Sequence, residues 1–277
     1  MPQNEAPTDL DHTERKTVET RQRPRAAVIL EIVRKEGQEE LARKFGPLWW
    51  SGLAAGLSAG FSMVAAGLMT AALPPGDWTR PLIAIGYTAG FLIVILGRQQ
   101  LFTENTITAL IPVLSRRHWA DFKAIARLWA IVLSANLVGA AIFALVVAQG
   151  GLFGEAPLAA FRDIGSHLVE VGPARNFAGG IAAGWLIAAL VWILPSAPEN
   201  RFLVVFFMTW LIGLGEFAHI IVGSVEVFFS LFSGDSSLIE IALRFMGPAL
   251  AGNIIGGSAV FTLITYAQIR EEMDHLA

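Results

Sequence analysis

Long uncharged apolar runs dominate this sequence, and two of them are interrupted by a short polar break. A transmembrane helix needs about 20 mostly apolar residues, and most of the runs reach that length. The two shorter runs, which begin at Pro81 and Phe202, are completed by apolar residues beyond a break. The runs cover Pro47–Leu73, Pro81–Gly97, Leu128–Gly154, Asn176–Pro198, Phe202–Gly215 and Phe245–Ile269. The pattern predicts an all-α integral membrane protein with six transmembrane helices, and it disfavours a soluble protein with buried core helices.

The two polar breaks indicate a solute pathway. The first break reads Arg98-Gln-Gln-Leu-Phe-Thr-Glu-Asn105 and the second reads Glu216-Phe-Ala-His219. Broken helices at bilayer depth are tolerated only where protein or a water-filled cavity satisfies the freed backbone groups. One break in each half of a duplicated chain is typical of transport proteins built from repeats. The breaks therefore favour a channel or transporter.

Composition and motifs argue against an enzyme. The chain has no cysteine, which excludes a disulfide framework, a thiolate metal site and a cysteine nucleophile. It also has no His-Glu-x-x-His, Gly-x-Ser-x-Gly or phosphate-binding Gly-Lys-Ser/Thr motif. We therefore expect no catalytic residue, no cofactor, no bound metal and no nucleic-acid partner.

The distribution of positive charge predicts the orientation and the domain boundaries. Basic residues crowd the segment before the first span and the loop between spans two and three, and they are sparse in the other loops. By the positive-inside rule, six spans with both termini in the cytoplasm fit this pattern. We expect no signal peptide, because no apolar core follows the early charges. We predict a disordered cytoplasmic tail (1–25), an amphipathic helix (26–46), a membrane domain (47–269) with repeats at 47–154 and 174–269, and a cytoplasmic tail (270–277).

Three short patterns recur in the same order in each half, which indicates an internal repeat. Gly52-Leu-Ala-Ala-Gly56 is answered by Gly180-Ile-Ala-Ala-Gly184, and Asn136-Leu-Val-Gly139 by Asn253-Ile-Ile-Gly256. The break at Leu101-Phe102-Thr103 is answered by Glu216-Phe217-Ala218. Because each half has three spans, an odd number, the second half enters from the opposite side. The sequence therefore predicts two inverted three-helix repeats whose breaks meet near the midplane.

Ionisable groups at bilayer depth are costly and are candidates for function. Five lie in or beside the breaks: Arg98, Glu104, Glu216, His219 and Glu226. His219 can change its charge near neutral pH and so protonate a passing anion, or it can be a structural histidine between helices. We expect Arg98 and Glu216 to face each other as a structural ion pair. We expect Asn136 to bond the loosened break backbone, and Asn253 either to do the same or to line the pore.

At these residues the chain resembles the formate/nitrite transporter family, in a divergent branch. The family reads Gly-Ala-Glu/Asp-Leu-Phe-Thr at the first break, Gly-Phe-Glu-His at the second and Gly-Asn-Ile-Ile-Gly-Gly in the last span. Here stand Arg98-Gln-Gln-Leu-Phe-Thr103, Glu216-Phe-Ala-His219 and Gly252-Asn-Ile-Ile-Gly-Gly257. The resemblance implies an aquaporin-like protomer in a bacterial inner membrane, assembled as a homopentamer in the lipid bilayer with one pore in each protomer.

The resemblance also implies a solute and a set of site residues. The family conducts small monovalent anions such as formate, nitrite, lactate or hydrosulfide, often together with a proton. By the resemblance His219 is the central pore histidine, Thr103 is its hydrogen-bonding neighbour, and Asn253 belongs to the polar patch beside it. Leu101 and Phe102, with Ile212, would form the apolar constriction. Glu104 would join the relay if the repeat, aligned on Phe102 and Phe217, brings it close to His219.

Several departures from the family pattern leave the function open. The glutamate before the histidine is Ala218, the asparagine of the fourth span is Gly184, and the lysine before that span is Leu168. Both break glycines are charged, as Arg98 and Glu216. Three hypotheses remain: a proton-linked path for a small anion or its acid, a pore for a neutral solute, and a membrane scaffold or sensor that does not transport. The solute itself cannot be read from the sequence.

Overall fold

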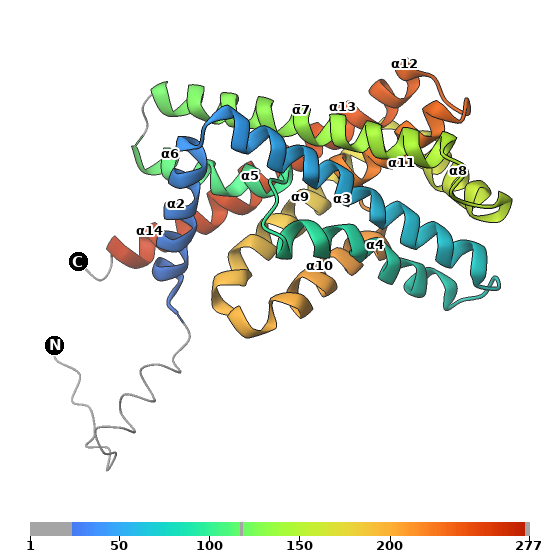
Figure 1. Cartoon of the computed structure of the whole chain (residues 1–277). Coiled ribbons are helices and arrows are strands. Elements are labelled where there is room, and N and C mark those ends of the chain that lie inside the picture. Colours follow the sequence, from blue (N-terminus) through green and yellow to red (C-terminus); the bar gives the residue numbers. More distant parts are fainter. Residues whose placement is uncertain (1–23, 117–118, 275–277) are drawn as a thin grey trace, which may run out of the picture.

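The computed structural model describes residues 24–116 and 119–274, and it assigns only helices and their connections there (Figure 1). The predicted disordered tail lies almost wholly outside these residues. The first half contains α2 (Ala26–Ala42), α3 (Phe45–Ala72), α4 (Thr79–Leu96), α5 (Phe102–Thr108), α6 (Leu110–Arg116) and α7 (Trp119–Gln149). The second half begins with α8 (Glu155–Glu170), α9 (Gly172–Ile193), two short 3-10 turns (Leu194–Ser196 and Pro198–Asn200), α10 (Arg201–Gly215) and α11 (Ile220–Phe232).

The last span combines α-helical and π-helical turns. It runs through α12 (Leu238–Glu240), a π-helix (Ile241–Met246), α13 (Gly247–Ile254), a second π-helix (Ile255–Thr262) and α14 (Leu263–Asp274). The helix therefore continues beyond Ile269, where we expected the membrane domain to end. At the other end of that domain, α3 begins at Phe45 and not at Pro47.

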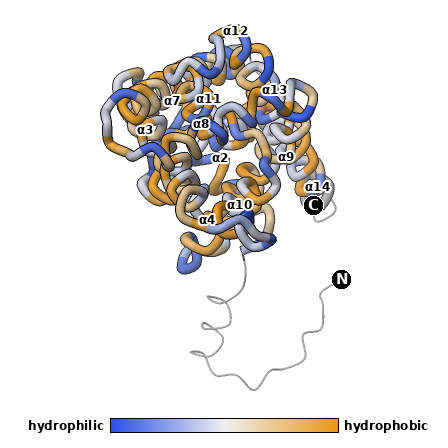
Figure 2. Tube along the Cα trace, turned by 90° about the vertical axis from the view of Figure 1, so that its right-hand side faces the viewer, coloured by the Kyte–Doolittle hydropathy of each residue, from blue (hydrophilic) through white to orange (hydrophobic). Residues whose placement is uncertain are grey.

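Five helices are long and apolar enough to cross a membrane, and a bent pair supplies a sixth span. The bent pair joins Pro198–Gly215 to Ile220–Phe232 at an angle of 48° across the second break. Large apolar side chains on the outward faces stay exposed, among them Ile85, Ile93, Val146 and Phe207. Figure 2 shows apolar residues running through the ring of helices seen from the α8 end. The predicted six-span membrane architecture is confirmed.

Helices of the two halves pack in matching pairs. The α3 helix packs against α7, and α9 packs against α13. A side chain at Gly56 would collide with the Asn136 carbonyl oxygen, and one at Gly184 would collide with the Asn253 carbonyl oxygen. Both pairs of helices therefore approach closely at equivalent glycines, as the small-residue patterns predict.

The repeat includes the helix that precedes the first span of each half. The α2 helix leads into α3 and lies at one end of the bundle, whereas α8 leads into α9 and lies at the other end (Figure 1). A side chain at Gly37 on α2 would collide with the Thr108 carbonyl oxygen, and one at Gly165 on α8 would collide with that of Glu226. The two repeats therefore begin at α2 and α8, earlier than the predicted starts at residues 47 and 174.

Candidate functional site

Each break is closed by one asparagine from a neighbouring helix. At the first break the Asn136 side chain accepts a hydrogen bond from Phe102 N (2.9 Å) and donates to the carbonyl oxygens of Gln100 and Gly52 (both 2.8 Å). A broken helix leaves backbone groups without partners, and these bonds satisfy them. The predicted structural role of Asn136 is confirmed.

The second break repeats this arrangement atom for atom. The Asn253 side chain accepts from Ile220 N (2.9 Å) and donates to the carbonyl oxygens of Ala218 (2.8 Å) and Gly180 (2.9 Å). Asn253 is fully buried. Its amide therefore satisfies the freed backbone groups of the second break, as we predicted for Asn136 at the first. A part for Asn253 in a polar pore lining stays a prediction.

These matching bonds correct the alignment of the two breaks. Phe102 is equivalent to Ile220, so Leu101 and His219 hold the same position, the residue just before the half-helix. The alignment of Phe102 with Phe217 was wrong. The backbone agrees with the new register, because Arg98 (φ 53°) and Glu216 (φ 51°) adopt the same left-handed conformation in the two breaks.

His219 lies at the centre of the molecule and contacts both breaks. Its Nδ1 accepts a hydrogen bond from Val222 N (3.3 Å), so in the neutral ring the proton lies on Nε2. Nε2 lies 2.8 Å from Thr103 Oγ1 on the other break, and it donates to that oxygen. The ring is 1% exposed and meets Phe91 edge-on, with the ring centroids 4.8 Å apart. The contact between His219 and Thr103 that the resemblance implies is therefore present.

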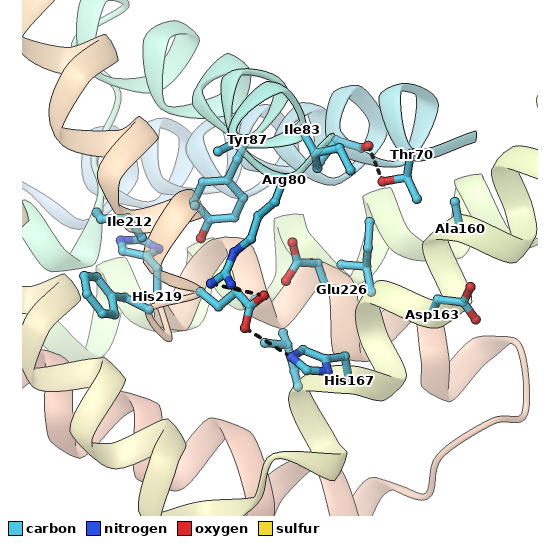
Figure 3. A pocket seen from close by; sticks show the side chains of 18 of the residues that line it. Thr70, Arg80, Ile83, Tyr87, Ala160, Asp163, His167, Ile212, His219 and Glu226 are labelled. Carbon is cyan, nitrogen blue, oxygen red and sulfur yellow. Dashed lines mark hydrogen bonds and ion pairs between the residues drawn. The ribbon is translucent and has the colours of Figure 1, made fainter. Parts of the chain in front are cut away.

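Two cavities approach this centre from opposite ends of the bundle. The cavity on the α8 side, here the α8 cavity, has a volume of about 630 Å³ and reaches His219 and Ile212 (Figure 3). The α2 cavity has a volume of about 330 Å³ and reaches Gln100 and Asn105. Leu101, Phe102 and Ile212 are each at most 2% exposed. The three residues predicted to form the constriction are therefore buried near the ends of the breaks, and the constriction itself stays a prediction.

The predicted ion pair between Arg98 and Glu216 does not form. Glu216 lies in the α8 cavity, where its carboxylate pairs with three basic groups: Arg175 (3.0 Å), Arg80 (3.4 Å) and His167 (3.5 Å). Arg98 lines the α2 cavity instead. The predicted pairing was wrong because each residue precedes its half-helix. The inverted repeat therefore places Arg98 and Glu216 toward opposite ends of the bundle, and neither lies at the midplane.

Glu104 does not lie beside His219, as the mistaken alignment suggested. In the new register its equivalent is Val222, one turn into the half-helix. Glu104 lines the α2 cavity with Glu36, Glu39 and Glu40 of α2. Its carboxylate therefore belongs to an acidic group on the α2 side, and its membership of a relay with His219 is not supported by a contact.

Sequence reasoning missed the basic groups around Glu216 as a cluster. Arg80, His167 and Arg175 come from α4, α8 and α9, so they are far apart in the chain. The sequence contained one indication of this cluster. The three residues are among the few charged or ionisable groups in the sparsely charged loops, and a charge at a break needs a partner of opposite charge. Arg80 also donates to the Leu214 carbonyl oxygen (3.1 Å) at the end of α10.

Comparison with known proteins agrees with the fold. A model of the formate/nitrite transporter family matches residues 27–267. The chain is 42% identical over 251 residues to the inner membrane protein YfdC of Escherichia coli (strain K12), which covers 91% of this chain and 81% of that protein. It is 25% identical over 193 residues to the uncharacterized transporter YwcJ of Bacillus subtilis (strain 168), which covers 67% of this chain and 74% of that protein.

Two solved structures share the architecture. A pentameric formate channel with formate bound aligns with a TM-score of 0.67 at 22% identity, over 86% of this chain and 98% of that chain. An ion channel of the same family aligns with a TM-score of 0.72 at 18% identity, over 88% of this chain and 96% of that chain. The predicted aquaporin-like fold with two broken helices is confirmed.

Proposed function

Because the chain belongs to the formate/nitrite transporter family, we propose that it passes a small monovalent anion or its neutral acid across the membrane, with a proton carried through His219. The observation that supports this proposal is the position of His219. Its ring lies between the two cavities, bonded to Thr103 of the opposite break, inside a layer with almost no exposure.

The chemistry follows from the cost of moving a charge through that layer. A bare anion loses its hydration in the apolar neck, where its free energy rises steeply. If a doubly protonated His219 ring, whose Nδ1 has released the Val222 N–H, gives its Nε2 proton to the anion, the solute crosses as a neutral acid, the ring is left neutral, and water in a cavity supplies the next proton. The Nε2 proton already points at a hydrogen-bond acceptor, so this nitrogen is the one placed to donate it.

We further propose that the protein is a homopentamer in a bacterial inner membrane, with both termini in the cytoplasm and a pore in each protomer. The α2 side carries most of the described basic residues, which supports a cytoplasmic location of this side by the positive-inside rule. The pentameric formate channel and the inner membrane relative support the assembly and the location. Both breaks belong to one chain, which supports a pathway within each subunit.

Flux into proteoliposomes tests the proposal. We expect the wild type to conduct formate, nitrite or lactate with a strong pH dependence, and we expect His219→Ala to remove that dependence. Thr103→Val should shift the pH profile, whereas Thr209→Val is a matched control, because Thr209 is equally buried but its hydroxyl donates only to backbone carbonyls of its own helix, at Val205 and Phe206. Flux of urea or glycerol without any anion flux would instead favour a neutral-solute pore. No flux of either kind would favour a scaffold or sensor.

A further inference from the structure

The α8 cavity contains a carboxyl group that the pathway described above does not use. Glu226 on α11 is 4% exposed, and within the described residues it has neither a hydrogen bond nor an ion pair. Figure 3 shows its carboxyl group directed into the cavity, between Tyr87 on one wall and Asp163 on the other. A buried polar group without a protein partner is unusual and points to a ligand.

Glu226 lies on the face of α11 that leads to His219. The two residues are two turns apart, which corresponds to about 10 Å along the helix axis. Gly223 lies between them and lines the same cavity, and the Phe245 ring packs against it. A solute that enters from the α8 side therefore meets Glu226 before it reaches the histidine.

The packing of α11 does not require a carboxyl group at this position. In the other half of the repeat the equivalent residue is Thr108, because Gly37 and Gly165 meet the carbonyl oxygens of Thr108 and Glu226 in the same way. The Thr108 hydroxyl is satisfied locally, by Glu104 O (3.2 Å) and Asn105 Oδ1 (3.3 Å). A small polar side chain is therefore sufficient for the fold, and the longer acid of Glu226 has another role.

Among the described residues, no basic group forms an ion pair with Glu226. On the elements around the cavity, α3 and the membrane part of α7 carry no titratable residue, and Arg244 of the neighbouring π-helix donates to the Val169 carbonyl oxygen (2.8 Å). Arg80 and His167 pair with Glu216. The titratable groups that face the cavity with Glu226 are Arg80 and Tyr87 of α4, Asp163 and His167 of α8, and Glu216 and His219 of the break.

We propose that Glu226 is an anion-binding group of the α8 cavity and that it binds in its protonated form. The carboxylic acid O–H donates a hydrogen bond to an oxygen of a small oxyanion, such as a carboxylate or nitrite. An ionised Glu226 would repel the same anion, so binding requires the proton. This inference rests on the proposed function and names the first contact of the same pathway.

Binding of formate to the purified, detergent-solubilised full chain tests the inference without transport. The half-saturating formate concentration, read from thermal stabilisation, should rise by about ten-fold between about pH 6 and about pH 9 in the wild type. Glu226→Gln keeps the shape and a hydrogen-bond donor but cannot ionise. This variant should bind formate with nearly the same strength over the whole pH range. Glu226→Thr, which copies the other half of the repeat, should bind weakly at every pH.

Asp235→Asn is the matched control, because it removes a partly exposed carboxylate that pairs with Arg162 (3.6 Å) on the same side but does not line the cavity. It should keep the wild-type pH dependence. The inference is overturned if Glu226→Gln also keeps that dependence, or if the wild type binds no formate at either pH. The proposed function is tested separately: His219→Ala should lose the anion flux and still bind formate in the α8 cavity with the wild-type pH dependence.

Discussion

Replacing Asn136 by alanine should destabilise the protein strongly, because one side chain satisfies both freed ends of the first break. The Phe102 N–H and the Gln100 carbonyl have no helical partner, since the chain between them is not helical. The Gly52 carbonyl lies inside α3, where the helix itself supplies a donor. Each buried polar group left unsatisfied costs about 1–3 kcal/mol, so we expect Asn136→Ala to lose about 2–6 kcal/mol of unfolding free energy.

Asn136→Asp gives a sharper version of the same test. The aspartate keeps an oxygen for the Phe102 N–H, but it places its second oxygen against the carbonyls of Gln100 and Gly52. It should therefore be at least as destabilising as alanine, although it is nearly the same shape. Asn253→Ala should lose a similar amount of unfolding free energy at the second break. The two losses should add in the double variant, because the side chains of Asn136 and Asn253 share no hydrogen-bond partner.

Reversible unfolding in mixed detergent and SDS micelles measures these differences. Asn176→Ala is the control: Asn176 is also a buried asparagine, but it donates to the carbonyls of Leu168 (2.6 Å) and Arg244 (2.8 Å), away from the breaks. We expect it to lose only about 1–2 kcal/mol, since orphaned carbonyls are tolerated better than orphaned N–H groups. A loss below about 1 kcal/mol for Asn136→Ala would refute the argument that the amide holds the break together.

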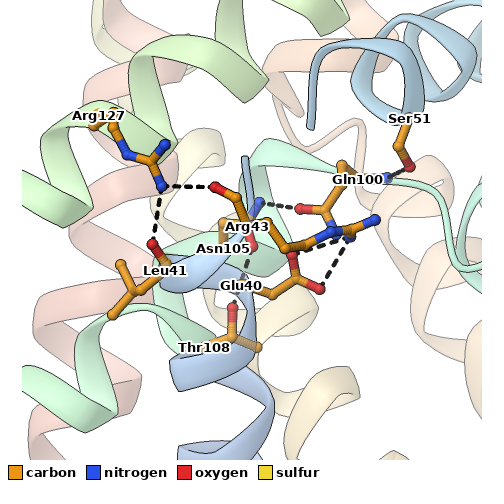
Figure 4. A network of polar contacts seen from close by, with 8 residues as sticks. All are labelled: Glu40, Leu41, Arg43, Ser51, Gln100, Asn105, Thr108 and Arg127. Atoms are coloured by element: carbon orange, nitrogen blue, oxygen red, sulfur yellow. Dashed lines mark hydrogen bonds and ion pairs between the residues drawn. The ribbon is translucent and has the colours of Figure 1, made fainter. Parts of the chain in front are cut away.

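Three further predictions concern the ends of the bundle. Glu216→Gly should be more stable than Glu216→Ala by about 1 kcal/mol in the same unfolding assay. Both variants lose the partly exposed ion pairs, but only glycine adopts the left-handed backbone conformation of this residue without strain. Arg127→Ala should increase hydrogen exchange and protease cleavage at the end of α2, because Arg127 donates to the carbonyls of Leu41 (2.9 Å) and Arg43 (2.8 Å) (Figure 4). Desolvation at the α2 cavity raises the pKa of the Glu36 carboxyl, against the opposing attraction of nearby arginines. The protonated Glu36 therefore stabilises the docking of α2 fully at low pH, and this stabilisation is lost as the pH rises through the raised pKa. Glu36→Gln should remove this contribution to the pH dependence of the hydrogen-exchange protection of α2.

Much of the architecture could be predicted because its causes are local in the sequence. The apolar runs, the breaks and the small-residue patterns each reflect a requirement of the bilayer or of close helix packing. The role of Asn136 could also be predicted, since a broken helix needs an external partner and an amide on a packed helix can supply one. The contact between Thr103 and His219 came from the resemblance alone, because no spacing in the chain indicates it.

The partners of the break charges could not be predicted, because they depend on the register of the repeat. Phe102 and Phe217 look equivalent in the sequence but occupy different positions in the two breaks. The better anchors were Arg98 and Glu216, which replace glycines at the left-handed position of each break. Aligning on them places His219 opposite Leu101, which separates Glu104 from the histidine.

The charges of the breaks are explained once α2 and α8 are counted as parts of the repeat. Each break presents its left-handed residue to the cavity on its own side, and the helix over that cavity carries the opposite charge. Glu36 of α2 lines the same cavity as Arg98, and His167 of α8 pairs with Glu216. The same fold position therefore carries opposite charges in the two halves: Glu216 forms ion pairs in the α8 cavity, and Arg98 faces acidic residues of α2 in the α2 cavity. Each charged residue at a position that favours glycine thus faces groups of opposite charge in the cavity on its own side, some of them on the preceding helix of the repeat.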